Sequence, residues 1–158
     1  MKKLRLLTRS PAETRDLAAR LGSVLAAGDL VALRGELGAG KTEFVRGLAR
    51  GLGVPADAVA SPSFALAYEY QGRVTLVHLD LYRLAGISPE FLPDLEDYLG
   101  GPQVTAVEWA ERLGGLLPPD YLEVVLTITS ESEREIVLCG HGPRGEELLV
   151  SLGVDPEE

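Results

Sequence analysis

The sequence contains no asparagine, a single cysteine (Cys139) and three lysines, which are Lys2, Lys3 and Lys41. A lone cysteine cannot form an internal disulfide or build a thiolate metal site by itself, which is typical of a reducing compartment. No window reaches the roughly 18 uninterrupted apolar residues of a membrane-spanning helix, and the apolar stretch after Met1 is too short for a signal peptide. We therefore expect a cytoplasmic protein that does not associate with a membrane.

Basic residues are scarce in the second half of the chain. The formal net charge is -9, with 15 Lys and Arg against 24 Asp and Glu, and the excess of acidic residues lies in residues 84–158. A chain of this charge does not bind polyanions tightly without a local basic patch, so direct binding of nucleic acid is not expected. The acidic half is interpreted as a solvated face, with a basic partner as the alternative.

The length and apolar content fit one compact unit. The chain has 158 residues, of which 46% are hydrophobic. This is enough to bury a substantial core, and we expect a single domain that spans residues 1–158.

Apolar runs separated by Pro and Gly predict alternating strands and helices. Strands are predicted at Leu4–Leu7, Asp29–Arg34, Phe64–Tyr70, Arg73–Asp80, Val104–Val107, Tyr121–Thr129 and Glu135–Cys139. Helices are predicted after the capping residue Ser10, at Thr42–Leu52, Ser88–Tyr98 and Gly145–Leu152. Short polar turns make hairpins of the third and fourth and of the last two strands. The class is α/β, with a mixed sheet, flanking helices and two β-hairpins.

The segment Gly35-Glu-Leu-Gly-Ala-Gly-Lys41-Thr42 matches the Walker A pattern in full, between a predicted strand and a predicted helix. Glycines in such a P-loop let backbone N–H groups turn toward phosphate oxygens, at the positive end of the following helix. Lys41 would neutralise the β- and γ-phosphates, and the Thr42 hydroxyl would bind Mg²⁺. The pattern predicts a P-loop NTPase-like domain.

Hydrolysis also needs an acidic residue, usually at the end of a nearby apolar strand. Asp80 and Glu108 each end such a strand. Ser61 and Ser63 lie where related domains carry a switch segment, although both could simply shape a proline turn. Arg83 is interpreted as an ion-pair partner. The two histidines, His78 and His141, give no reason to expect a zinc site.

The identity of the nucleotide base can be inferred from the absence of asparagine. Guanine-selective P-loop proteins usually carry an Asn-or-Thr-Lys-x-Asp motif, and the lysines of this chain do not provide one. The sequence therefore favours ATP over GTP.

Four segments together resemble the bacterial TsaE family. These are the P-loop, Ser61-Pro-Ser-Phe, His78-Leu-Asp-Leu-Tyr-Arg-Leu and Val107-Glu-Trp109, and the likeness runs from about Ser10 through the last hairpin. The resemblance implies a small ATPase that acts with TsaD and TsaB homologues in making threonylcarbamoyladenosine beside the anticodon of tRNA, touching tRNA only indirectly.

The resemblance also implies residue roles. Thr42 and Glu108 would bind Mg²⁺, while Asp80 would serve catalysis by orienting or activating water, together with Lys41. Nucleotide contacts are implied for Gly38, Ala39, Gly40, Lys41, Thr42, Glu43, Ser10, Thr14 and Arg134. Two alternatives stay open: a small-molecule kinase, and a module that binds ATP as a switch without turnover.

Overall fold

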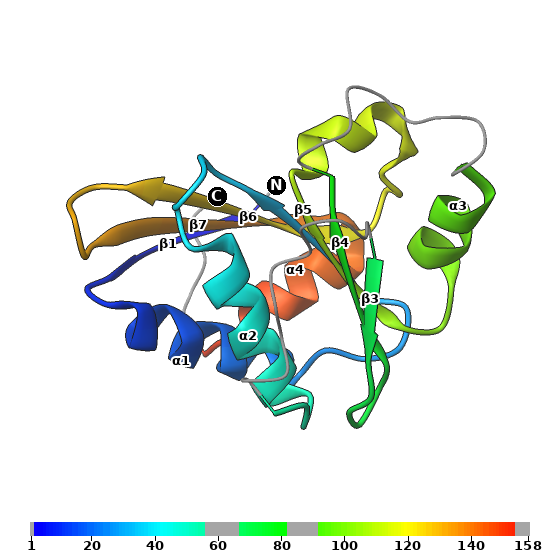
Figure 1. Ribbon diagram of the computed structural model, residues 1–158, viewed down its shortest axis with the longest axis horizontal. Helices are drawn as coiled ribbons and strands as arrows, with labels where there is room; N and C mark the ends of the chain where they lie inside the picture. The colour runs from blue at the N-terminus through cyan, green and yellow to red at the C-terminus, as the bar shows by residue number, and fades with distance from the viewer. Residues whose placement is uncertain (1, 56–66, 82–91, 154–158) are drawn as a thin grey trace.

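The computed structural model describes residues 2–55, 67–81 and 92–153 (Figure 1). The strands are β1 (Lys2–Thr8), β2 (Leu30–Arg34), β3 (Ala67–Tyr70), β4 (Leu76–Asp80), β5 (Val104–Glu108), β6 (Tyr121–Ile128) and β7 (Arg134–His141). The helices are α1 (Pro11–Gly22), α2 (Lys41–Gly51), α3 (Leu92–Gly100) and α4 (Gly142–Val150), with a 3₁₀ segment η2 (Ala110–Leu116).

Within the described residues, seven strands form one sheet in the order β1-β7-β6-β2-β5-β4-β3. The four central strands β6, β2, β5 and β4 run parallel to one another, while β1, β7 and β3 pair antiparallel. The antiparallel pairs β3–β4 and β6–β7 are the two predicted hairpins. The expected α/β class with a mixed sheet is therefore confirmed.

The parallel centre brings three strand ends to one edge of the sheet. Leu33 near the end of β2 pairs with Glu108, and Asp80 at the end of β4 also pairs with Glu108. Because parallel strands share the edge at which they end, the loop after β2 and both candidate carboxylates meet there.

Helices cover both faces of the sheet (Figure 1). Apolar residues of α1, α2 and α4 form one buried cluster with one face of the strands, including Leu21, Phe44 and Leu149. Residues of α3 and η2 form a second cluster on the opposite face, including Leu95 and Leu113. Successive strand side chains alternate between these two faces, so only those on one face can point toward the loop after β2.

The helix ends differ slightly from the prediction. Ser10 caps α1 by accepting a hydrogen bond of 3.1 Å from Glu13 N, as expected, but the Glu13 carboxylate accepts from Arg9 N instead of from Ser10 N. The segment η2 was not anticipated, because Gly114 and Gly115 interrupt any helical spacing there. Helix α4 begins at Gly142, earlier than predicted, since Pro143 fits its first turn.

Several predictions fall outside the described residues. These are Ser61, Ser63, Arg83, the start of the Phe64–Tyr70 strand and the capped start of the Ser88–Tyr98 helix. Across the ranges that are described, no helix is long and apolar enough to cross a membrane.

Candidate functional site

The glycine-rich loop joins β2 to α2 and leaves the start of α2 open. Gly40 is the residue before α2 and has φ 104°, a left-handed conformation that favours glycine. It has no side chain with which to cap the helix, so it leaves the first N–H groups of α2 without a side-chain cap hydrogen bond. The loop therefore presents the positive end of a helix, a common position for a bound anion.

Lys41 is held within its own loop. Its ammonium group donates hydrogen bonds to the carbonyls of Gly35 and, at 3.0 Å, Glu36. The side chain is buried, and burial lowers the pKa of Lys41, while the charges of Glu108, Glu111 and Asp80 act in the opposite direction. The ammonium group thus lies among acidic residues at the edge where the parallel strands end.

Glu108 is the centre of a buried polar group. Its carboxylate oxygens accept hydrogen bonds of 3.2 and 3.3 Å from Thr42 Oγ1, and Oε2 also contacts His78 Nε2. Glu108 is 3% exposed and His78 is fully buried. The arrangement gives a hydroxyl and a carboxylate side by side at the start of α2, with the imidazole behind the carboxylate. These hard oxygen ligands fit Mg²⁺.

Asp80 lies beside this group. Its backbone pairs with that of Glu108, and its side chain is part-exposed at the end of β4. Strand alternation places His78, Asp80 and Glu108 on the same face of the sheet. The backbone pairing thus brings Asp80 and Glu108 to the edge of the sheet at which β2 ends and the loop begins.

Trp109 contributes an aromatic ring over Lys41. Among the described residues other than glycine, Trp109 alone has a positive φ, at 60°. This conformation is unusual for a bulky side chain and is often found at functional sites. The ring centroid lies 4.2 Å from Lys41 Nζ and 5.9 Å from the Arg112 guanidinium carbon. The ring therefore forms a cation–π contact with the loop lysine.

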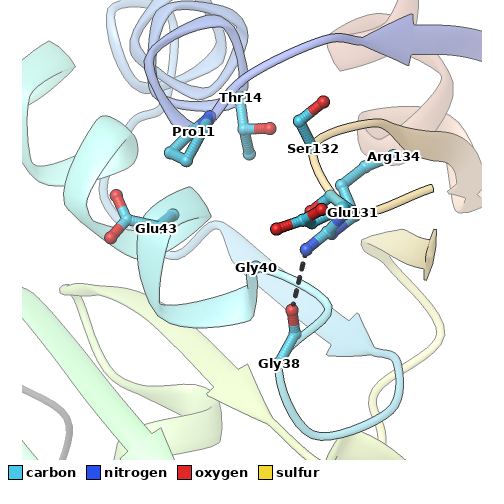
Figure 2. Close-up of a pocket in the computed structure, with 8 residues that line it drawn as sticks. All are labelled: Pro11, Thr14, Gly38, Gly40, Glu43, Glu131, Ser132 and Arg134. Atoms are coloured by element: carbon cyan, nitrogen blue, oxygen red, sulfur yellow. Dashed lines mark hydrogen bonds between the residues drawn. The ribbon is translucent and has the colours of Figure 1, made fainter. Parts of the chain in front are cut away.

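A cavity of about 160 Å³ opens beside the glycine-rich loop (Figure 2). Its lining comes from α1, the glycine-rich loop, α2, the β6–β7 turn and the first residue of β7: Pro11, Thr14, Gly38, Gly40, Glu43, Glu131, Ser132 and Arg134. The Arg134 guanidinium donates hydrogen bonds of 3.2 Å to the carbonyls of Gly38 and Ala39. It also contacts carbonyls of its own turn, including Ser130 and Glu133. Arg134 therefore ties the turn to the loop.

The other predicted nucleotide contacts differ in whether they line this cavity. Thr14 lines the cavity, and its hydroxyl shares a 2.8 Å hydrogen bond with that of Thr8. Glu43 also lines it, and Arg15 and Arg46 both pair with its carboxylate, which balances its negative charge. Ser10 caps α1 and is not among the lining residues, although the next residue, Pro11, is.

Sequence reasoning missed the role of His78, the ring contact of Trp109 and the cavity residues Glu131 and Ser132. A signal for His78 was present, because the spacing His78-x-Asp80 in a strand puts both side chains on one face. The turn residues could not be found this way, because their approach to the loop depends on the order of strands in the sheet.

Comparisons with known proteins agree on one family. Residues 8–136 match the family model described as "Threonylcarbamoyl adenosine biosynthesis protein TsaE". The chain is 38% identical over 136 residues to a protein of Treponema pallidum named tRNA threonylcarbamoyladenosine biosynthesis protein TsaE, covering 86% of this chain and 100% of that one. It is 38% identical over 153 residues to the Bacillus subtilis protein of the same name, covering 96% and 95%.

A solved structure shows the same fold. The crystal structure of Bacillus subtilis YdiB superposes with a TM-score of 0.80 at 34% sequence identity, and the match covers 97% of this chain and 96% of that one.

Proposed function

The chain belongs to the TsaE family, and from this premise we propose that it is a Mg²⁺-dependent ATPase that supports the making of threonylcarbamoyladenosine in tRNA. The observation that carries the proposal is the contact of Thr42 with Glu108 at the start of α2, beside Lys41 and Asp80.

The glycine-rich loop supplies the phosphate contacts. Backbone N–H groups from Gly38 to Thr42 bind phosphate oxygens at the start of α2. Lys41 leaves the carbonyls of its own loop to neutralise the β- and γ-phosphates. This exchange replaces two neutral acceptors with charged ones, which strengthens the hydrogen bonds.

The nucleoside end of ATP occupies the cavity between α1 and the β6–β7 turn (Figure 2). This cavity is continuous with the loop through Gly38 and Gly40. Five residues predicted as nucleotide contacts line it, namely Thr14, Gly38, Gly40, Glu43 and Arg134. Arg134 also fixes the loop. The missing guanine motif favours adenine at this position.

The metal is held by Thr42 and Glu108, with His78 orienting the Glu108 carboxylate. When bound, Mg²⁺ supplies positive charge that neutralises the β- and γ-phosphates. Asp80 orients the attacking water and accepts its proton as the bond to the γ-phosphorus forms and the bond to the leaving ADP oxygen breaks. No acceptor other than water is needed.

Hydrolysis by the chain alone should be slow. Five backbone carbonyls already engage the guanidinium of Arg134, the arginine that lines the cavity. A positive charge supplied by a partner raises the rate of P-loop enzymes by roughly 10³ to 10⁵. We propose that TsaD and TsaB homologues are the partners, and that the acidic chain meets tRNA through them.

Reconstitution tests this function. The chain is combined with TsaB and TsaD homologues from one source, tRNA, ATP and the threonylcarbamoyl donor, and modified tRNA and phosphate are measured together. Repeated rounds of modification should require the wild-type chain and stop with Lys41→Ala. Equal yields without the chain would contradict the proposal. Phosphate transfer that requires an added small-molecule acceptor would instead favour a kinase, and nucleotide binding without phosphate release would favour a switch module.

A further inference from the structure

A group of three side chains of types that can bind a metal ion lies on strands β6 and β7. Cys139 and His141 are two residues apart on β7, and Glu123 on β6 pairs directly with Cys139. One donor atom from each, the thiol sulfur, an imidazole nitrogen and a carboxylate oxygen, lie within 4.8 Å of one another. Strand alternation places all three side chains on one face of the sheet.

The His141 ring is held by a stacking contact, but its Nε2 atom makes no hydrogen bond within the described residues. Nε2 is buried and, within the described part of the chain, has no hydrogen-bond partner. It lies 3.8 Å from Glu123 Oε1, beyond hydrogen-bond range. Tyr121 stacks on the ring with centroids 4.2 Å apart and planes 7° from parallel. His141 precedes α4 without using its side chain as a cap. A buried imidazole nitrogen without a partner is costly, and a bound cation would satisfy it.

One carboxylate oxygen of Glu123 pairs with Arg34, and the other faces the imidazole of His141. Oε2 lies 3.0 Å from Arg34 Nε, while Oε1 is the oxygen nearer to His141. Carboxylates that bind metals are often held by a second group in this way. The pair with Arg34 lets Glu123 bind a cation through Oε1 without giving up its existing contact.

Cys139 supplies a soft ligand. It is 3% exposed and forms no disulfide. Burial raises the pKa of its thiol, and the charge of Glu123 adds to this effect, so an ion bound at neutral pH displaces the thiol proton. Thiolate, imidazole and carboxylate together are a ligand set typical of Zn²⁺.

We propose that Glu123, Cys139 and His141 form a binding site for a thiophilic divalent ion, Zn²⁺, with the fourth position left to water. Metal–ligand distances of about 2.0 to 2.3 Å require the donor atoms to draw together by roughly 1 Å. Side-chain rotation on two paired strands provides this movement, and the ion would cross-link β6 to β7.

This site is separate from the nucleotide site. Glu123 pairs with Ala32 of β2, whereas Glu108 pairs with the next residue, Leu33. Successive strand residues face opposite sides of the sheet, so the two sites lie on opposite faces. Occupancy of one can be measured without the other.

Cobalt titration of the untagged chain tests the proposal. Co²⁺ bound to a thiolate gives a charge-transfer absorption band, and Cys139 is the only thiol in the chain, so the band reports this residue. We expect a band that saturates at one ion per chain and disappears when Zn²⁺ is added. Glu123→Gln and His141→Gln should each weaken Co²⁺ binding by at least about tenfold, and Cys139→Ser should remove the band.

Two controls separate this site from others. Glu135→Gln changes a carboxylate on the same face of β7, and Glu108→Gln changes the nucleotide site; both should keep the band at wild-type affinity. Absence of a band in the wild-type chain would overturn the proposal without reference to any variant. The proposal would also be overturned if Glu123→Gln and His141→Gln both bound Co²⁺ with the wild-type band and affinity, because the thiol would then bind the ion alone. Saturation at one ion per two chains would also overturn it.

Discussion

Lys41 Nζ lies 4.2 Å from the centre of the Trp109 ring, and Trp109 is the only tryptophan in the chain. The same nitrogen donates to carbonyls of its own loop. A phosphate in the loop would compete for this ammonium group and draw it away from the ring. The contact therefore links an optical signal to the state of the loop.

Tryptophan fluorescence should change when Mg-ATP binds, because the cation over the ring moves or is neutralised. Titration at fixed protein concentration measures the change. Lys41→Met removes the cation, so its starting signal should differ from that of the wild type and its response to Mg-ATP should be lost. A flat wild-type titration, under conditions where calorimetry detects binding, would show that Lys41 does not leave the ring.

His78 should act as a positioning residue for Glu108. His78→Leu removes the buried contact with the Glu108 carboxylate, and the Mg²⁺ concentration needed for half-maximal hydrolysis should rise about 10- to 100-fold. His78→Gln keeps a donor in the side chain and should recover part of the loss. If both variants fold and show the wild-type Mg²⁺ dependence, His78 has a packing role only.

Arg134 should affect nucleotide affinity more than the chemical step. Arg134→Met removes the hydrogen bonds to the Gly38 and Ala39 carbonyls and frees the turn from the loop. We expect KM for ATP to rise about tenfold with kcat changed less. Arg5→Met changes an exposed arginine of β1, is the matched control and should leave both constants unchanged. A fall in kcat at constant KM would instead indicate that Arg134 acts in the transition state.

The contact between α1 and α2 should not tolerate a methyl group at Gly47. A Cβ there would lie 2.3 Å from Arg15 O and 2.5 Å from the Ala18 methyl carbon. Overpacking costs more than the roughly 1 kcal/mol that alanine gains in helix propensity, so Gly47→Ala should lose about 1 to 2 kcal/mol of unfolding free energy. Gly100→Ala, with nothing within 4 Å, should lose none. Chemical denaturation of both variants measures the difference, and equal stabilities would contradict the contact.

Local patterns were sufficient for most of the elements and for part of the site. The apolar run before Gly35 and the glycines after it predicted a strand, a loop and a helix, and these form β2, the loop and α2. Asp80 and Glu108 were selected because each ends an apolar strand, and the parallel pairing of β4 with β5 brings their backbones together.

Contacts that depend on strand order were not predictable. Arg134 reaches the loop because β6 pairs with β2, and His141 meets Glu123 because β7 pairs with β6. No local spacing encodes the pairing of β6 with β2, and the predicted β6–β7 hairpin did not fix the register that places Glu123 opposite Cys139. The spacing Cys139-x-His141 was present, but its third ligand comes from another strand, and the single cysteine argued against a metal site.

Phosphate release from Mg-ATP by the purified chain, without any acceptor, tests the central claim most directly. The wild type should release phosphate slowly, and Glu108→Gln and Asp80→Asn should reduce the single-turnover rate about 100-fold or more while nucleotide binding changes only a few-fold. Hydrolysis at the wild-type rate in both variants, or loss of binding in proportion to the loss of rate, would contradict the assignment of these two carboxylates to the chemistry of an ATPase.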